Sequence, residues 1–256
     1  MNVLCDLDGV IYRGGAVLPG VPEALRRLLN SGANAYFITN NSTRTPEATA
    51  AKISGLTGVA LSGDQILTSA QAAMTMLDTT DAPVFVVGED GLREAVTRYD
   101  FEITDDPTEA RSLVVGLTRS LSYDLVNDAM QAILGGARFI ATNDDTTFPT
   151  EEGLAPGCGA IVAAIAASTG TEPEVAGKPN PAMRELIKTT IEGPAWIIGD
   201  RVDTDVALAD GEPDWESILV LTGITDRESA PEAGADHVVE DFSAAVDLVL
   251  RHPDRS

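Results

Sequence analysis

The sequence contains few basic residues, few histidines and few cysteines. Lysine and arginine together account for 17 of the 256 residues, with three lysines among them, whereas 40 residues are acidic, so the formal net charge is −23. Such a surface repels nucleic acid and anionic membranes, and we expect neither as a partner. The two cysteines argue against a disulfide framework or a cysteine metal site, and the two histidines argue against a zinc hydrolase.

Long apolar runs are also missing. No stretch approaches the run of about eighteen apolar residues that marks a membrane-spanning helix, and the N-terminus has no basic region followed by an apolar signal segment. We therefore expect a cytoplasmic protein. Its acid excess, its three lysines and its 5% of aromatic residues resemble proteins of salt-loving organisms, and we predict a halophilic host. An ordinary acidic protein is the alternative.

Short apolar runs alternate with amphipathic stretches along the whole chain, as in α/β proteins. This alternation predicts a doubly wound α/β fold with a parallel sheet. A segment of about 135 residues separates "TNN" from "GKP", and it is too long for a simple crossover, so we expect a second compact unit within it. The predicted strands cover residues 2–6, 34–40, 82–88, 112–117, 138–143, 195–200 and 217–223, and the predicted helices cover residues 21–32, 122–136, 159–170 and 180–191.

Polar residues follow several of the predicted strands. Ligands of parallel sheets bind beyond the carboxyl ends of the strands, so these residues are expected to converge. Carboxylate and carbonyl oxygens suit Mg²⁺, which usually binds together with a phosphate, and a lysine is a point charge for that phosphate. Taken singly, each of these short patterns is also typical of an ordinary turn. The residues are Asp6, Asp8, Thr39, Asn40, Asn41, Asp200, Asp203 and Asp205, with Lys178 before a helix.

Four short motifs carry a resemblance to a known family. "DLDGVIY", "ITNNSTR", "GKPNP" and "GDRVDTD" resemble the four ordered motifs of the haloacid dehalogenase superfamily of phosphohydrolases. "VVGLTRSLSYDLVNDAM", "ATNDDTTFPTEEGLAPGCGAIVAAI" and "LVLTGIT" resemble its NagD-type, or para-nitrophenylphosphatase-like, branch. The resemblance implies a discontinuous catalytic core, residues 1–68 and 175–256, with an inserted α/β cap domain, residues 69–174, for substrate selection.

The resemblance also assigns roles to the acids. Asp6 would be the nucleophile that forms an aspartyl-phosphate, and Asp8 would protonate the leaving group and then activate water. Mg²⁺ would bind to the carboxylates of Asp6 and Asp200 and to the backbone carbonyl of Asp8. Asp205 would orient a metal-bound water.

Further residues would contact the substrate. By resemblance, Thr39, Asn40 and Asn41 would bind the phosphate, and Lys178 would stabilise charge in the transition state. In the cap, a loop with Asn143 and Asp144 is the candidate contact to the leaving group. The alternative is that this loop is only a polar turn.

The resemblance therefore implies a Mg²⁺-dependent phosphomonoester phosphatase that acts on a small phosphorylated metabolite. Phosphoglycolate, a sugar phosphate, a nucleoside monophosphate and pyridoxal phosphate all stay open as substrates. A homodimer formed through the cap is common among such proteins, and a homodimer and a monomer are the two alternatives for this chain. The alternative function is a non-catalytic or signalling phospho-acceptor domain on the same type of sheet.

Overall fold

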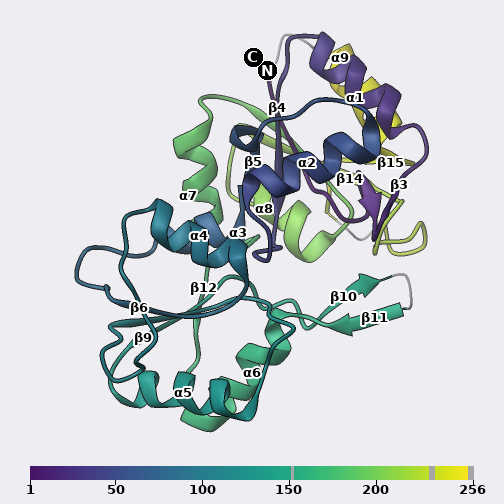
Figure 1. Ribbon diagram of the computed structural model, residues 1–256. Helices are drawn as coiled ribbons and strands as arrows, with labels where there is room; N and C mark the ends of the chain where they lie inside the picture. The colour runs from purple at the N-terminus through teal and green to yellow at the C-terminus, as the bar shows by residue number, and fades with distance from the viewer. Residues whose placement is uncertain (151–152, 231–233, 253–256) are drawn as a thin grey trace. The chain divides into compact units, whose positions relative to one another are not determined.

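The computed structural model describes residues 1–150, 153–230 and 234–252. The chain forms two compact units, and Figure 1 shows their helices and strands coloured by residue number. The first unit consists of Met1–Thr39, Pro46–Leu67 and the chain from Ile187 onward, and the second consists of Asn40–Thr45 and Thr68–Leu186. The second unit thus includes residues 175–186, which the resemblance to the family assigns to the core. The division into a catalytic core and a cap stays a prediction.

The first unit is built on a six-stranded sheet with the order β15-β14-β13-β1-β4-β5. The central strand β1 pairs in parallel with β13 on one side and with β4 on the other. The order of the strands along the chain reverses between β1 and β13, where ligands of doubly wound sheets bind. The strands are β1 Asn2–Cys5, β4 Asn34–Thr39, β5 Ile66–Thr68, β13 Ala195–Gly199, β14 Trp215–Val220 and β15 His237–Val239.

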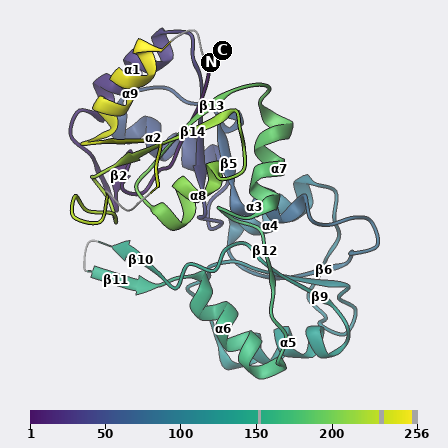
Figure 2. The same ribbon diagram turned by 180° about the vertical axis from the view of Figure 1, so that it is seen from behind.

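Helices cover both faces of this sheet. On one face, α1 (Val21–Asn30), α2 (Pro46–Thr57) and α9 (Phe242–Arg251) form a continuous apolar core with the strands, and α1 lies beside α9 in Figures 1 and 2. On the other face, the π-helical turn Val202–Val206 and the short helix α8 (Ala207–Ala209) contact β14. A small hairpin, β2 (Tyr12–Arg13) and β3 (Ala16–Val17), follows β1.

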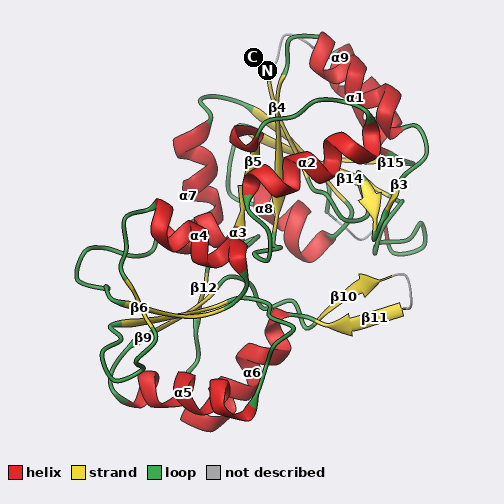
Figure 3. Ribbon diagram, in the orientation of Figure 1, coloured by secondary structure: helices red, strands yellow, loops and turns green. Residues whose placement is uncertain are grey.

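The second unit has its own five-stranded parallel sheet, with the order β12-β9-β8-β6-β7. Figure 3 shows helices on both of its faces: α3 and α4 lie on one side, and α5 and α6 on the other. The predicted doubly wound α/β architecture with parallel sheets is therefore confirmed. The elements are α3 Ser69–Met74, β6 Val84–Val87, α4 Asp90–Arg98, β7 Ile103–Thr104, β8 Ser112–Val115, α5 Tyr123–Leu134, β9 Arg138–Ala141, β10 Thr147–Thr150, β11 Gly153–Pro156, α6 Cys158–Thr169 and β12 Glu174–Val175.

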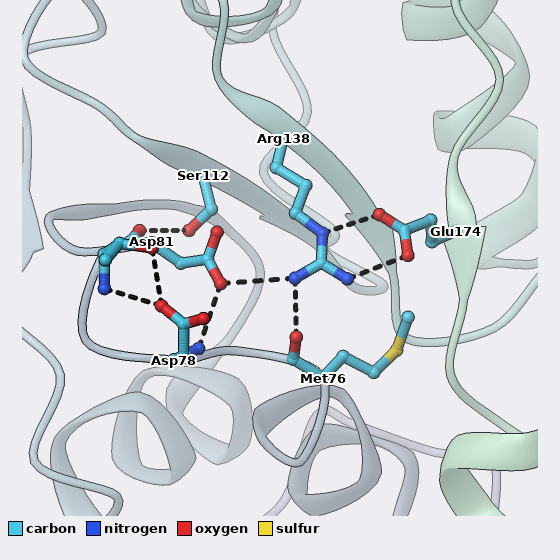
Figure 4. Close-up of polar contacts among 7 residues, drawn as sticks. Met76, Asp78, Asp81, Ser112, Arg138 and Glu174 are labelled. Atoms are coloured by element: carbon cyan, nitrogen blue, oxygen red, sulfur yellow. Dashed lines mark hydrogen bonds and ion pairs between the residues drawn. The ribbon is translucent and has the colours of Figure 1, made fainter.

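Arg138 joins three segments of the second unit (Figure 4). Its guanidinium donates two hydrogen bonds to Glu174, of 2.6 and 2.8 Å, and further bonds to Asp81 and to the carbonyl of Met76. The carbonyl of Asp81 in turn accepts a bond of 2.8 Å from Ser112 Oγ. These bonds connect β8, β9 and β12 to the loop after α3.

Helix α7 (Pro181–Thr190) carries the chain from the second unit into the first. No helix among the described residues is both long enough and apolar enough to cross a membrane. Both cysteines are buried, as expected of small fillers. Burial raises the pKa of the Cys5 thiol, with a further contribution from the charge of Asp6, and burial raises the pKa of Cys158 to about 11. Both thiols therefore stay neutral.

Candidate active site

A tight turn after β1 fixes the two N-terminal acids. The backbone amide of Asp6 donates a hydrogen bond of 2.8 Å to the carbonyl of Ile198 on β13, which extends the ladder by one residue. Three successive amides then donate to the carbonyl of Leu7, and Gly9 adopts a positive φ of 87°. A side chain at that φ would be strained, so glycine suits this position. Asp6 is buried at the strand end and Asp8 is half-buried on the turn.

Backbone surrounds the carboxylate of Asp200, which follows β13. A Cβ atom at Gly9 would lie 2.5 Å from Asp200 Oδ2, and one at Gly223 would lie 1.7 Å from it. The amide of Ile224 donates a hydrogen bond of 2.7 Å to the same oxygen. Two glycines and one amide therefore form a close cradle that fixes this carboxylate.

Asp205 is folded back toward Asp200 by the π-helical turn. Its Oδ2 accepts hydrogen bonds of 3.2 Å from the amides of Asp200 and Arg201, while its own amide donates to the carbonyl of Arg201 at 3.0 Å. A Cβ atom at Gly199 would lie only 2.1 Å from the Cβ of Asp205. The absence of a side chain at the end of β13 therefore makes room for this acid.

These contacts bring three buried carboxylates together. Oxygen atoms of Asp6, Asp200 and Asp205 all lie within 4.8 Å of one another. Like charges at such distances are unfavourable in a buried site unless a cation or a proton compensates them. The donor set contains only carboxylate oxygens, which fits Mg²⁺ and not a soft metal. Asp6 and Asp200 lie together as the predicted metal site requires; Asp205 joins the same group, and its indirect role stays a prediction.

Thr39 lies at the same edge of the first sheet. It is the last residue of β4, and Phe37 on that strand pairs with Cys5 on β1, so Thr39 and Asp6 both follow paired positions of neighbouring parallel strands. Its side chain is buried. This placement is compatible with the predicted phosphate contact, which stays a prediction.

In the second unit, the Asn40 side chain holds the backbone of Lys178. Asn40 Oδ1 accepts a hydrogen bond of 2.7 Å from the Lys178 amide, and Asn40 Nδ2 donates to the Lys178 carbonyl at 3.3 Å. Nδ2 also donates to Asp145 Oδ2 at 3.2 Å. Lys178 itself is 3% exposed. Both polar atoms of the Asn40 side chain thus bond to neighbouring residues, and its predicted contact to phosphate stays a prediction.

The other predicted substrate contacts of the second unit differ in exposure. Asn41 is exposed, and its Oδ1 accepts bonds of 2.9 and 2.7 Å from the amide and hydroxyl of Thr43, which forms an Asx turn. Asn143 is buried and donates a bond of 2.7 Å to the carbonyl of Asn40, whereas Asp144 is exposed. The predicted roles of Asn41, Asn143 and Asp144 in substrate binding stay predictions.

Two contributors were not singled out from the sequence. Asp145 bonds to Asn40, but its carboxylate follows Asp144 in a polar loop and nothing distinguishes the two acids by pattern. Gly223 lies against Asp200, and the available signal was a glycine in the loop after the buried strand β14, which ends at Val220. Asp203 forms an ion pair with Arg201 at 2.7 Å.

Comparisons with known proteins agree with this geometry. A model of haloacid dehalogenase-like hydrolases matches residues 3–102, and a HAD-hydrolase-like model matches residues 175–245. A dihydroxyacetone phosphatase of Corynebacterium glutamicum is 37% identical over 231 residues, which are 88% of this chain and 82% of that protein.

Solved structures show the same relationship. A p-nitrophenyl phosphatase from Archaeoglobus fulgidus has a TM-score of 0.88 at 32% identity, over 96% of this chain and 98% of that one. A glycerol phosphate phosphatase from Mycobacterium tuberculosis, solved in complex with magnesium, has a TM-score of 0.87 at 32% identity, over 94% of this chain and 74% of that one. The predicted family and enzyme class are confirmed: the chain belongs to the haloacid dehalogenase-like hydrolases, in their para-nitrophenylphosphatase-like branch, and is a phosphatase.

Proposed function

We propose that this protein is a Mg²⁺-dependent phosphomonoester phosphatase that works through an aspartyl-phosphate on Asp6. The observation that carries the proposal is the group of three buried carboxylates, Asp6, Asp200 and Asp205, beyond the central strands β1 and β13. The relatives named above act on phosphate monoesters according to their names, which supports the same reaction class here.

In the first step, a carboxylate oxygen of Asp6 attacks phosphorus, and the bond from phosphorus to the ester oxygen breaks. Asp8 donates its proton to the leaving oxygen, so an alcohol departs and Asp6 carries the phosphoryl group. In the second step, the Asp8 carboxylate takes a proton from water as the water oxygen attacks phosphorus. The bond between phosphorus and the Asp6 oxygen breaks, inorganic phosphate leaves, Asp6 is again a carboxylate and Asp8 is again protonated.

Charge neutralisation is the main requirement of this reaction, because an anionic nucleophile approaches an anionic phosphate. Asp6 and Asp200, with the carbonyl of Asp8, are the residues that would hold Mg²⁺, and Asp205 would orient a water molecule beside it. When bound, Mg²⁺ supplies positive charge that offsets the repulsion between the carboxylate and the phosphate. Lys178 and Thr39 would hold phosphate oxygens through an ammonium and a hydroxyl.

We propose a small phosphorylated metabolite as the substrate, with three-carbon phosphates as the first choice. Two of the relatives are named for dihydroxyacetone and for glycerol phosphate, which share a three-carbon unit. Sugar phosphates, phosphoglycolate, nucleoside monophosphates and pyridoxal phosphate form the comparison set.

The test is a screen of these esters for phosphate release, with Mg²⁺ and with EDTA, in dilute buffer and in molar KCl. We expect Mg²⁺-dependent turnover of at least one ester, and none above background for Asp6→Asn. Turnover that persists in EDTA would contradict the metal requirement. Stable phosphorylation of Asp6 without repeated turnover would favour the alternative, a signalling phospho-acceptor domain.

A further inference from the structure

Three segments of the second unit meet at the backbone of Lys178. Asn40 comes directly after β4, Asn143 comes from the loop after β9, and Lys178 follows β12. The side-chain amide of Asn40 bonds to both the backbone N–H and the backbone C=O of Lys178, as a neighbouring strand would. Asn143 in turn bonds to the carbonyl of Asn40. Hydrogen bonds therefore link Asn143 to Asn40 and Asn40 to Lys178.

Further hydrogen bonds and close packing restrict the movement of Asn143, Asn40 and the Lys178 segment. The carbonyl of Asn40 accepts a second bond of 2.6 Å from Ser69 Oγ, and Asn143 Oδ1 accepts a bond of 3.2 Å from the amide of Asp145. A Cβ atom at Gly177 would lie 2.6 Å from Asn40 Oδ1, so the lysine segment lies directly against the asparagine. Asn143 is 5% exposed and Lys178 is 3% exposed. Buried amides in such an arrangement hold position because each lost bond leaves a buried polar group without compensation.

We propose that Asn143 is a positioning residue of the phosphatase reaction, which holds the Lys178 segment in place through Asn40. The inference rests on the proposed function, in which the Lys178 ammonium stabilises charge on the phosphoryl group. It gives Asn143 a different task from the leaving-group contact expected from the sequence. A displacement of about 1 Å in a catalytic group costs about a hundredfold in rate, so a residue that never touches substrate affects turnover.

The two roles predict different kinetics for Asn143→Ala. Misplacement of the lysine affects the phosphoryl group, which every substrate shares. We therefore expect kcat/KM to fall by about tenfold or more on para-nitrophenyl phosphate, glycerol phosphate and a nucleoside monophosphate alike, with their ranking unchanged. A leaving-group contact would instead change the ranking, and that result would overturn the inference.

A matched control separates positioning from loss of stability. Ser112 is fully buried in the same unit and also donates one hydrogen bond to a backbone carbonyl, that of Asp81, at 2.8 Å. Ser112→Ala is expected to lower the melting temperature by an amount similar to Asn143→Ala while leaving kcat/KM near the wild-type value. An equal loss of kcat/KM in both variants would overturn the inference. If Asn143→Ala does not fold, Asn143→Ser is measured in its place.

A double-mutant cycle with Lys178→Met tests whether Asn143 acts through Lys178. The affinity for inorganic phosphate in the presence of Mg²⁺, measured by calorimetry, provides a readout that needs no turnover, alongside kcat/KM. Asn143→Ala should weaken phosphate binding and turnover in the wild-type background and change both less than about twofold in the Lys178→Met background. Equal losses in the two backgrounds would overturn the inference. Wild-type activity in Lys178→Met alone would instead show that the role proposed for Lys178 is wrong.

Discussion

A Cβ atom at Gly223 would lie 1.7 Å from Oδ2 of Asp200, so the backbone beyond β14 touches the carboxylate at the end of β13. The amide of the next residue, Ile224, bonds to the same oxygen. The position of this acid therefore depends on the loop after β14 as much as on its own strand. Neither glycine of the cradle, Gly9 or Gly223, can gain a side chain without moving Asp200.

Gly223→Ala tests this dependence. The added methyl group must displace the Asp200 carboxylate, so we expect weaker Mg²⁺ binding and a loss of activity of about tenfold or more at low Mg²⁺. Titration of activity with Mg²⁺, together with calorimetric Mg²⁺ binding, measures the effect. Gly55→Ala is the matched control, because a Cβ atom there meets nothing within 4 Å. An unchanged Mg²⁺ affinity in Gly223→Ala would contradict the proposed metal site.

The second prediction distinguishes the two acids after β1. Asp6→Asn should lower kcat by at least about ten-thousandfold on all esters, because an amide cannot form the acyl-phosphate. Asp8→Asn removes only the proton donor, so the loss should be about a hundredfold or more on an alkyl phosphate and smaller on para-nitrophenyl phosphate, whose leaving group needs little protonation. Steady-state kinetics on both esters decide it. Equal losses for Asp8→Asn would remove general acid catalysis from the mechanism.

Much of the site could be predicted because its acids directly follow buried strands. Asp6 and Asp200 come after apolar runs, and the alternation of elements predicts that such runs lie parallel and end at one edge. Asp205 lies beside Asp200 because the chain forms a π-helical turn there, and no periodic pattern in the sequence predicts such a turn. The bond from Asn143 to Asn40 joins residues about a hundred positions apart through loop geometry, the feature least encoded in local pattern.

Missed secondary structure has similarly local causes. Helix α2 reads "PEATAAKISGLT", in which small residues and threonine leave no clear apolar stripe, so its pattern did not predict a helix. Helix α9 was predictable in part, because Asp241 directly precedes it and aspartate is a common N-cap residue. The Asp241 side chain accepts a hydrogen bond of 2.8 Å from the amide of Ala244. The short strands β5 and β15 have three residues each, too few to show alternation.

The third prediction concerns salt. If the charge of −23 is an adaptation to a saline cytoplasm, repulsion among surface acids destabilises the fold in dilute buffer, and molar KCl screens it. We expect the melting temperature to rise steadily from dilute buffer to molar KCl at constant pH. A flat or falling series would identify an ordinary acidic protein.

The fourth prediction concerns acid pH. Burial opposes ionisation of Asp236, but hydrogen bonds from the amide and hydroxyl of Ser217, both 2.8 Å, outweigh it and lower the pKa of this carboxyl. Its folded pKa lies below its unfolded value, so its contribution to stability is present above the unfolded pKa of about 3.9 and is lost as the pH falls through the folded pKa. Asp236→Asn should therefore lower the free energy of unfolding at pH 7, and this loss should become progressively smaller below about pH 4.

Thermal or urea unfolding of wild type and Asp236→Asn at a series of pH values measures this difference. The exposed Asp210→Asn serves as the control, and its stability should differ little from wild type across the series. A stability difference for Asp236→Asn that stays constant from pH 7 to acid would show that the carboxylate charge is not the source.

The sheet order described above also determines when the site can assemble during synthesis. The central strand β1 is translated well before its neighbour β13, in which Ala195 pairs with Asn2. At roughly 5 to 20 residues per second, the interval between the two strands is about 10 to 40 s. The whole second unit is translated within that interval, while β1 still lacks this partner. Asp6 and Asp200 meet only after β13 has been translated, so a nascent chain that stops before β13 lacks the group of three carboxylates.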